Sequence, residues 1–93
     1  MRYSVIIPTL NGEKRIVSLL ETLQTQSLPP SQILVVDSQS DDATVERAQS
    51  VAGVHVEMIR RQDFDHGGTR DWAIRRCDSD VVVFMTQDAM PTD

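Results

Sequence analysis

Four short apolar runs, separated by longer stretches of mixed polarity, organise this chain of 93 residues. They lie at 3–8, 33–36, 54–59 and 80–86, and all but the third contain at least three consecutive apolar side chains. Continuous apolar runs of this length are typical of strands buried on both faces, as in a parallel sheet covered by helices. The pattern therefore predicts four strands.

An apolar stripe with helical spacing lies between the first two runs. It consists of Ile16, Leu19, Leu20 and Leu23, at positions i, i+3, i+4 and i+7. That spacing predicts an amphipathic helix over about 12–26, with Asn11 as its cap and Glu13 near its positive end. Two further helices are expected over about 42–51 and 69–77.

Strands that alternate with helices imply right-handed crossovers and a parallel sheet. We expect one α/β domain over 1–93, a half-Rossmann-like three-layer sandwich with its strands in the order 3-2-1-4. In that order the first and fourth strands are neighbours at the switch point, and ligands bind outside the carboxyl ends of the strands. Thr9 and Asp88 would then face one crevice, with Asp37 beside it.

The composition, 40% hydrophobic and 25% charged, is that of a globular protein. A formal net charge of −5 argues against a nucleic-acid partner, because nucleic-acid binders usually carry a basic surface. No apolar run approaches the roughly 20 residues that cross a bilayer, and the first residues lack the pattern of a signal peptide. We therefore expect a cytoplasmic protein.

The glycines of the chain suggest an anion site, although not of the common kind. The turn after the first strand, 8–13, is neither G-x-G-x-x-G nor a Walker A sequence. Gly67 and Gly68 lie just before the third predicted helix, where backbone N–H groups favour anions. Arg70 could form a fork with a phosphate or a base carbonyl. The alternatives are a tight turn for the glycines and a surface charge or salt bridge for Arg70.

Two aspartates follow predicted strands. Asp37 could accept hydrogen bonds from the imide N–H of a base or from a ribose hydroxyl; the alternative is that it caps its own turn or the next helix. Asp88 could bind a hard divalent cation, Mg²⁺ or Mn²⁺, which needs only one or two carboxylates when substrate phosphates supply the other ligands. The alternative for Asp88 is an ordinary loop aspartate.

Four segments carry motifs that can be compared with a known family. Residues 5–13 contain P-x-x-N-x-E, residues 33–44 contain V-V-D-x-x-S-x-D-x-T, and 64–71 and 84–91 match F-x-H-G-G-T-R-N, except for a final Asp71, and F-x-T-Q-D-A-x-P. In this order the segments resemble family 2 glycosyltransferases of the GT-A fold, in a rhamnosyltransferase-like branch. The resemblance covers nearly the whole chain and identifies it as the N-terminal, nucleotide-sugar-binding part of such an enzyme.

The resemblance implies a role for each matching position. Thr9 and Asp37 would contact a uracil or thymine base, Glu13 the ribose, and Arg70 the base and diphosphate. Asp88 would hold the metal, in the second acidic place of a D-x-D motif. Thr86 and Ala89 replace acids of that motif, which implies that the protein supplies fewer metal ligands. The implied donor-site residues are Pro8, Thr9, Asn11, Glu13, Asp37, Gly68, Arg70 and Gln87.

The implied activity is inverting transfer of a sugar, with rhamnose favoured, from a dTDP- or UDP-sugar donor to a polysaccharide or lipid-linked acceptor. The catalytic base and acceptor site are expected beyond Asp93, in a longer protein at the inner face of the membrane. The alternative function is a non-catalytic nucleotide-binding or assembly module of the same fold. Because the fourth strand would be an exposed edge, we also expect the chain to self-associate.

Overall fold

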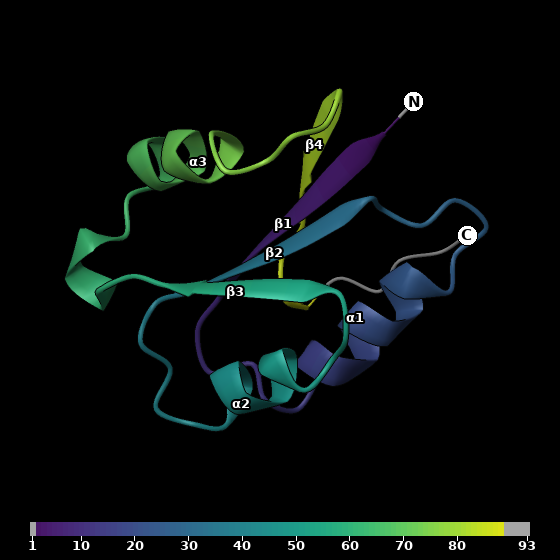
Figure 1. Ribbon diagram of the computed structural model, residues 1–93. Coiled ribbons are helices and arrows are strands. Elements are labelled where there is room, and N and C mark those ends of the chain that lie inside the picture. Colours follow the sequence, from purple (N-terminus) through teal and green to yellow (C-terminus); the bar gives the residue numbers. More distant parts are fainter. Residues whose placement is uncertain (1, 89–93) are drawn as a thin grey trace.

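One parallel sheet forms the centre of the computed structural model, which describes residues 2–88 (Figure 1). Its strands are β1 (Tyr3–Thr9), β2 (Gln32–Asp37), β3 (Val54–Met58) and β4 (Val81–Phe84). They follow the order β3-β2-β1-β4, and each neighbouring pair is parallel. The predicted order 3-2-1-4 is confirmed, and it places β1 between β2 and β4.

Helices cover both faces of this sheet. They are α1 (Ile16–Gln24), α2 (Thr44–Gln49) and α3 (His66–Ile74), and a short 3₁₀ helix, η1 (Arg61–Asp63), precedes α3. Figure 1 shows α1 and α2 on one side of the strands and α3 on the other. The three-layer sandwich that the sequence predicts is therefore present. None of the helices within residues 2–88 is long and apolar enough to span a membrane.

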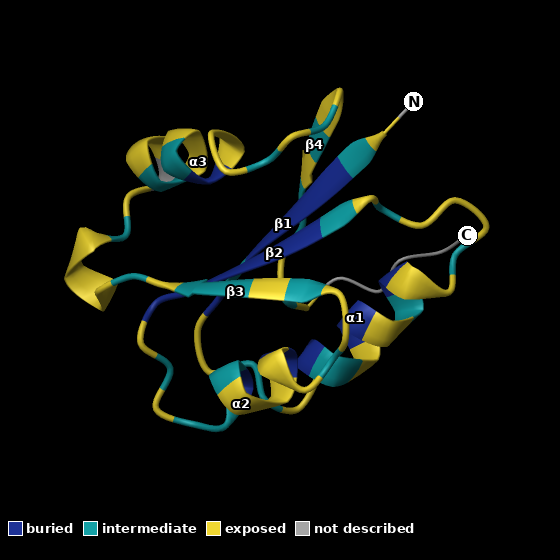
Figure 2. Ribbon diagram, viewed as in Figure 1, coloured by how far each residue is buried: buried dark blue, intermediate teal, exposed yellow. Residues whose placement is uncertain are grey.

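The two central strands are the most deeply buried elements, drawn dark blue in Figure 2. Successive side chains of a strand point to opposite faces, so β1 and β2 contribute to two cores. One core joins Val5, Ile7, Ile33 and Val35 to the buried stripe of α1 and to Ala48 of α2. The other joins Ile6, Leu34 and Val36 to Ala73 of α3. Burial on both faces explains why the middles of these strands, 5–8 and 33–36, carry no polar side chain.

Two predicted helix starts are wrong. The first helix begins at Ile16 and not near residue 12, and the backbone N–H groups of Gly12 and Glu13 donate to the side chains of Thr44 and Asp42. The third begins at His66, three residues before the predicted start, because the Asp65 side chain accepts a hydrogen bond from Gly68 N and caps it.

The last strand lies at the edge of the sheet, as predicted. Within residues 2–88, β4 pairs with β1 alone. The side chains of Val81 and Val83 are 41% and 37% exposed. An edge strand with exposed apolar side chains offers unpaired backbone groups to another chain.

Candidate functional site

The carboxyl ends of β1 and β2 are joined by a buried hydrogen bond. Thr9 and Asp37 are register partners, and Thr9 Oγ1 donates to Asp37 Oδ1 at 2.7 Å. Asp37 is 0% exposed and also accepts hydrogen bonds from the Ser40 backbone N–H and hydroxyl. The side chain thus stabilises its own turn, which is the alternative that the sequence left open. A contact between Asp37 and a base stays a prediction.

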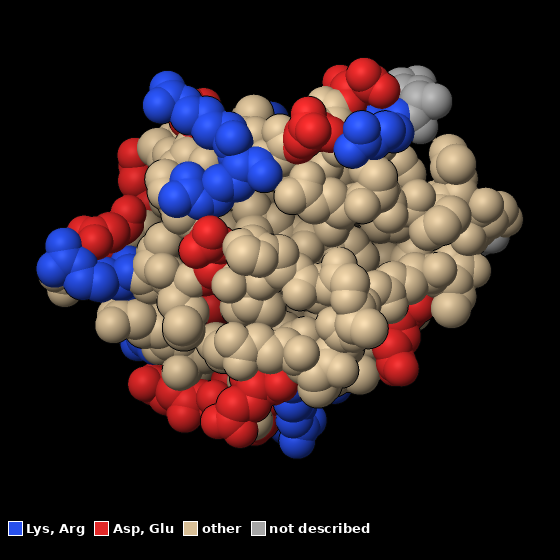
Figure 3. Space-filling model, in the orientation of Figure 1, with Lys and Arg blue, Asp and Glu red and all other residues tan. Residues whose placement is uncertain are grey.

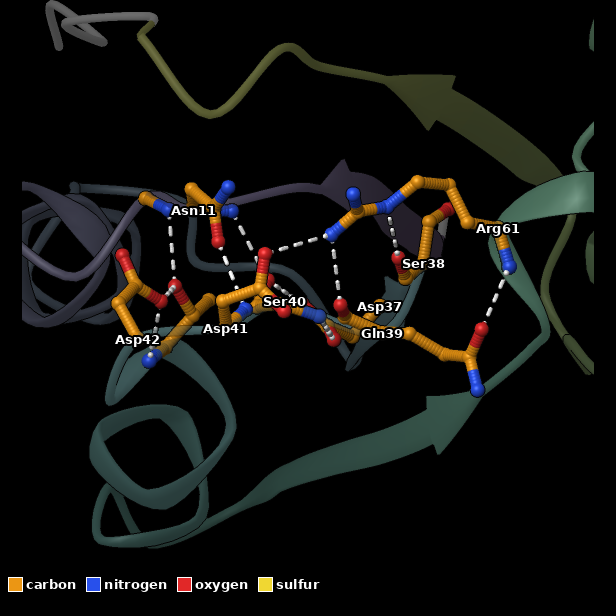
Figure 4. A network of polar contacts seen from close by, with 10 residues as sticks. Asn11, Asp37, Ser38, Gln39, Ser40, Asp41, Asp42 and Arg61 are labelled. Carbon is orange, nitrogen blue, oxygen red and sulfur yellow. Dashed lines mark hydrogen bonds and ion pairs between the residues drawn. The ribbon is translucent and has the colours of Figure 1, made fainter.

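Asn11 joins two loops and does not cap α1, so that part of the sequence prediction is wrong. Its backbone is left-handed, with φ of 53°, a conformation that asparagine tolerates better than most residues. Asn11 N donates to Ser40 Oγ at 2.9 Å, and Asn11 Oδ1 accepts from Asp41 N at 2.8 Å (Figure 4). The loops that follow β1 and β2 are therefore held against each other.

The carboxylate of Glu13 contacts the start of α2 and not the positive end of α1. Glu13 Oε2 accepts from Ala43 N at 3.1 Å, and Glu13 N donates to Asp42 Oδ2 at 3.2 Å. Desolvation would raise the pKa of Asp42, but hydrogen bonds from the Thr44 hydroxyl and from the backbone N–H groups of Thr44 and Glu13 outweigh it and lower the pKa below its ordinary value. Both carboxylates support the loops in this structure.

Arg61, a residue that the sequence analysis missed, braces the loop after β2. Its Nε donates to Ser38 O at 3.3 Å, and its Nη2 donates to Gln39 O at 2.9 Å and to Asp41 Oδ2 at 3.2 Å (Figure 4). In return, Gln39 Oε1 accepts from Arg61 N at 3.1 Å. Gln39 is left-handed, with φ of 57°, so this brace holds an unfavoured backbone conformation. The only signal in the sequence was an arginine in a polar loop.

Gln87 connects the end of β4 to the loop after β1. Gln87 Oε1 accepts from Leu10 N at 2.8 Å, and Gln87 Nε2 donates to Leu10 O at 2.9 Å. The side chain therefore satisfies both backbone groups of one residue. A Cβ atom built on Gly12 would lie 2.7 Å from Gln87 Oε1, closer than packed atoms approach. Glycine at position 12 leaves room for this contact.

A cavity of about 560 Å³ opens where these strand ends meet. Strands β1 and β2 and the segments after them contribute Ile6, Pro8, Thr9, Leu10, Val36 and Ser38. Its other walls are Arg61, Phe64, Thr69, Arg70, Ala73, Phe84, Met85, Thr86 and Gln87. The cavity thus spans the topological switch point between β1 and β4, where ligands bind in open α/β sheets.

The charged side chains in the described lining of the cavity are both basic, although the chain is acidic. Its described lining includes two arginines, Arg61 and Arg70, and no Asp or Glu, whereas the whole chain has a net charge of −5. Figure 3 shows a similar separation on one face, with basic side chains over α3 and acidic ones over α2. The Arg70 guanidinium lies 4.6 Å from the centroid of the Phe84 ring, and within residues 2–88 it makes no ion pair. Such a wall suits an anionic ligand with an apolar part.

Gly68 does not form the free anion site that the sequence suggested. It lies inside the first turn of α3, and its N–H donates to Asp65 Oδ2 at 3.0 Å. A carboxylate already occupies the position that an anion would take. A Cβ atom at Gly68 would lie 2.9 Å from that oxygen, so glycine at this position leaves room for the Asp65 side chain.

The structure separates the predicted site residues into three groups. Pro8, Thr9, Arg70 and Gln87 line the cavity. Asp37, Asn11, Glu13 and Gly68 make the structural hydrogen bonds described above. Asp88 directly follows the cavity wall and is exposed.

The donor set available for a metal is small. Within residues 2–88 no group of three or more His, Cys, Asp or Glu side chains could hold a metal ion. Asp88 makes no hydrogen bond or ion pair there that would compete for its carboxylate, and carboxylate oxygen suits Mg²⁺ or Mn²⁺. The residues present therefore fit a cation that takes its other ligands from a bound diphosphate. The predicted effect of Ala89 lies outside the described residues.

Fold and cavity together define a parallel α/β domain with a cavity at its switch point, the place where such domains bind ligands. The chain belongs to glycosyl transferase family 2, because the model of that family matches residues 4–93. It is 37% identical over 94 residues to the O-antigen chain rhamnosyltransferase RfbN of Salmonella typhimurium, and this covers 100% of the chain and 30% of the relative. The chain thus spans under a third of that relative's length.

Solved structures of glycosyltransferases share the fold. The chain is similar to residues 1–349 of Staphylococcus aureus TarS in complex with UDP-GlcNAc, with a TM-score of 0.76, 32% identity and coverage of 95% of this chain and 27% of that one. It is also similar to the mannosyltransferase PcManGT of Pyrobaculum calidifontis in complex with GDP-Man and Mn²⁺. There the TM-score is 0.75 at 25% identity, covering 96% of this chain and 28% of that one.

The contact between Gly12 and Gln87 predicts a coupled pair of substitutions. Gly12→Ala should destabilise the chain by about 1–2 kcal/mol, because the new methyl group displaces the Gln87 side chain from Leu10. In a Gln87→Ala background the same change should cost far less. Urea unfolding of the unaltered chain, the two single variants and the double variant measures both changes in the free energy of unfolding.

Gly67→Ala is the matched control for this pair. A Cβ atom at Gly67 would meet nothing within 4 Å, and alanine is favoured over glycine in a helix. This change should leave the chain as stable or more so. An equal loss from Gly12→Ala in both backgrounds would show that Gln87 is not what the methyl group displaces.

Proposed function

We propose that this chain is the nucleotide-sugar-binding part of an inverting glycosyltransferase that uses a dTDP- or UDP-sugar. The observation that carries the proposal is the charge of the cavity. An apolar cavity at the switch point, with two arginines and no acid in its described lining, suits a ligand that combines a flat base with a diphosphate. The similarity to O-antigen chain rhamnosyltransferases supports rhamnose as the sugar and a polysaccharide as the acceptor, and a lipid-linked saccharide is the other acceptor that we propose.

In this proposal the two walls of the cavity bind different parts of the donor. The base lies against apolar side chains such as Pro8 and Leu10, near Thr9. The diphosphate lies toward the end of β4, within reach of Arg70. Asp88 holds a divalent cation there, and the presence of Mn²⁺ in structures of related glycosyltransferases supports a metal at this place. When bound, the cation neutralises charge on the diphosphate.

The chemistry requires that the chain stabilise a leaving group. An acceptor hydroxyl attacks the anomeric carbon of the donor, the bond from that carbon to the diphosphate oxygen breaks, and the nucleoside diphosphate leaves. Arg70 stabilises the negative charge that grows on the diphosphate. The base that takes the acceptor's proton lies beyond Asp93, in a longer protein at the cytoplasmic face of the membrane.

The proposal predicts that the chain binds UDP or dTDP at the cavity. Titration with UDP in the presence of Mn²⁺, followed by amide chemical shifts, should move the signals of Thr9, Phe84 and Gln87. Arg70→Ala should weaken binding by roughly tenfold, the effect of one charge-assisted hydrogen bond. Arg75→Ala removes the same charge from a position outside the cavity lining and should have little effect. Unmoved signals around the cavity would count against the proposal.

The metal is tested by a separate variant. Mn²⁺ should tighten UDP binding to the unaltered chain by roughly tenfold compared with EDTA, and Asp88→Asn should abolish that gain because the carboxylate supplies the ligand. Asp71→Asn, an exposed acid on α3 outside the cavity lining, should retain the gain. Calorimetry with and without Mn²⁺ measures the difference. A full gain in Asp88→Asn would remove this aspartate from the metal site.

We also propose that this 93-residue chain self-associates through β4, because that edge exposes Val81 and Val83. Light scattering at high protein concentration should give a dimer mass. Val81→Lys should shift the mass toward a monomer, because a charged edge residue opposes pairing. Leu28→Lys, which alters an exposed leucine away from the sheet edge, should not. A monomer mass for the unaltered chain at high concentration would refute the proposal.

A further inference from the structure

Arg61 has hydrogen-bonding capacity that residues 2–88 do not use. Its Nε and Nη2 atoms donate to the loop after β2, as described above. Its Nη1 atom has no hydrogen-bond partner among the residues that the structure describes, and Figure 4 shows this nitrogen pointing away from the loop. Because Arg61 also lines the cavity, these N–H donors are available to a ligand there.

The guanidinium is held in place before any ligand arrives. Three hydrogen bonds fix it against Ser38, Gln39 and Asp41. A free arginine side chain loses considerable rotamer freedom when it binds a ligand, whereas a braced one has already lost it. Arg61 is therefore suited to position a ligand group as well as to attract negative charge.

The two arginines of the cavity lie toward different strand ends. Arg61 bonds to Ser38 after β2, whereas Arg70 lies over Phe84 of β4, the strand that Asp88 follows. β1 lies between β2 and β4. If the diphosphate lies at the β4 end, as in the proposed function, then the base of the same nucleotide lies toward Arg61.

We infer that Arg61 Nη1 donates a hydrogen bond to a ring carbonyl oxygen of the bound base, and this inference rests on the proposed function. Guanidinium nitrogens only donate, so their partner must be an acceptor. Uracil and thymine carry ring carbonyl oxygens, which match a fixed pair of N–H groups. Arg61 is then a residue that recognises the base, and Arg70 recognises the diphosphate.

The test compares a ligand that carries phosphates with one that does not. Affinities of UDP and of uridine are measured by NMR titration for the unaltered chain and for Arg61→Ala. Both ligands should bind roughly tenfold more weakly to the variant, because both present the same base carbonyls. Arg61→Lys should not restore uridine binding, because uridine is uncharged and lysine lacks the planar fork.

Two controls separate recognition from neighbouring effects. Arg60→Ala removes the same charge one residue away, where the side chain pairs with Asp63 at 2.7 Å and lies outside the cavity lining. Asp41→Ala removes the ion pair of the brace but leaves Nη1 and the bonds to Ser38 and Gln39 in place. Both variants should bind UDP and uridine within about twofold of the unaltered chain, a change of less than one hydrogen bond.

Three results would overturn the inference. Unchanged affinities in Arg61→Ala would show that Nη1 contacts no part of the nucleotide. A loss for UDP without a loss for uridine would assign Arg61 to the phosphates. An equal loss in Asp41→Ala would show that Arg61 acts by bracing the loop. Failure of the unaltered chain to bind either ligand would instead refute the proposed function on which the inference rests.

Discussion

The burial of β1 on both faces and along both edges is the constraint on which the rest of the structure depends. β1 pairs with β2 on one side and with β4 on the other, and its side chains enter both cores. A polar group inside such a strand would need an internal partner or would cost free energy. The buried polar side chains of β1 meet this requirement, because Ser4 bonds to Gln32 and Thr9 to Asp37. The other polar groups of the site lie after the strand ends, where the chain leaves the core.

The polar residues after the strands divide between structural and ligand-binding roles. Asn11 and Asp42 use their side chains to fix the loops after β1 and β2 against each other, and Asp37 stabilises its own turn. Gln87 does the same between the ends of β1 and β4. Arg70, Asp88 and the Nη1 atom of Arg61 are not used in this way among the described residues. A rim made rigid by the first set can hold the second set at fixed positions around a ligand.

The sheet and its order followed from local patterns. The apolar runs around Ile7, Val35 and Val83 indicated strands, and the spacing from Ile16 to Leu23 indicated α1, because burial on one face repeats with the period of the element. The alternation of the elements implied right-handed crossovers in a parallel sheet. The order 3-2-1-4 was the half-Rossmann expectation among the orders that this allows, and the structure confirms it. The helix starts were less predictable, since Asp65 was not recognised as the residue that caps α3.

The order of strands and helices, and the edge of the sheet at which polar residues gather, were encoded in the chain because hydrophobic periodicity is a local property. The partners of those polar residues were not. Gln87 bonds to a residue 77 positions away, and Arg61 to one 22 positions away, and no local period relates such positions. Only the packed sheet decided that Asp37 would be buried and Arg61 would line the cavity, because each outcome depends on which loops the crossovers bring together.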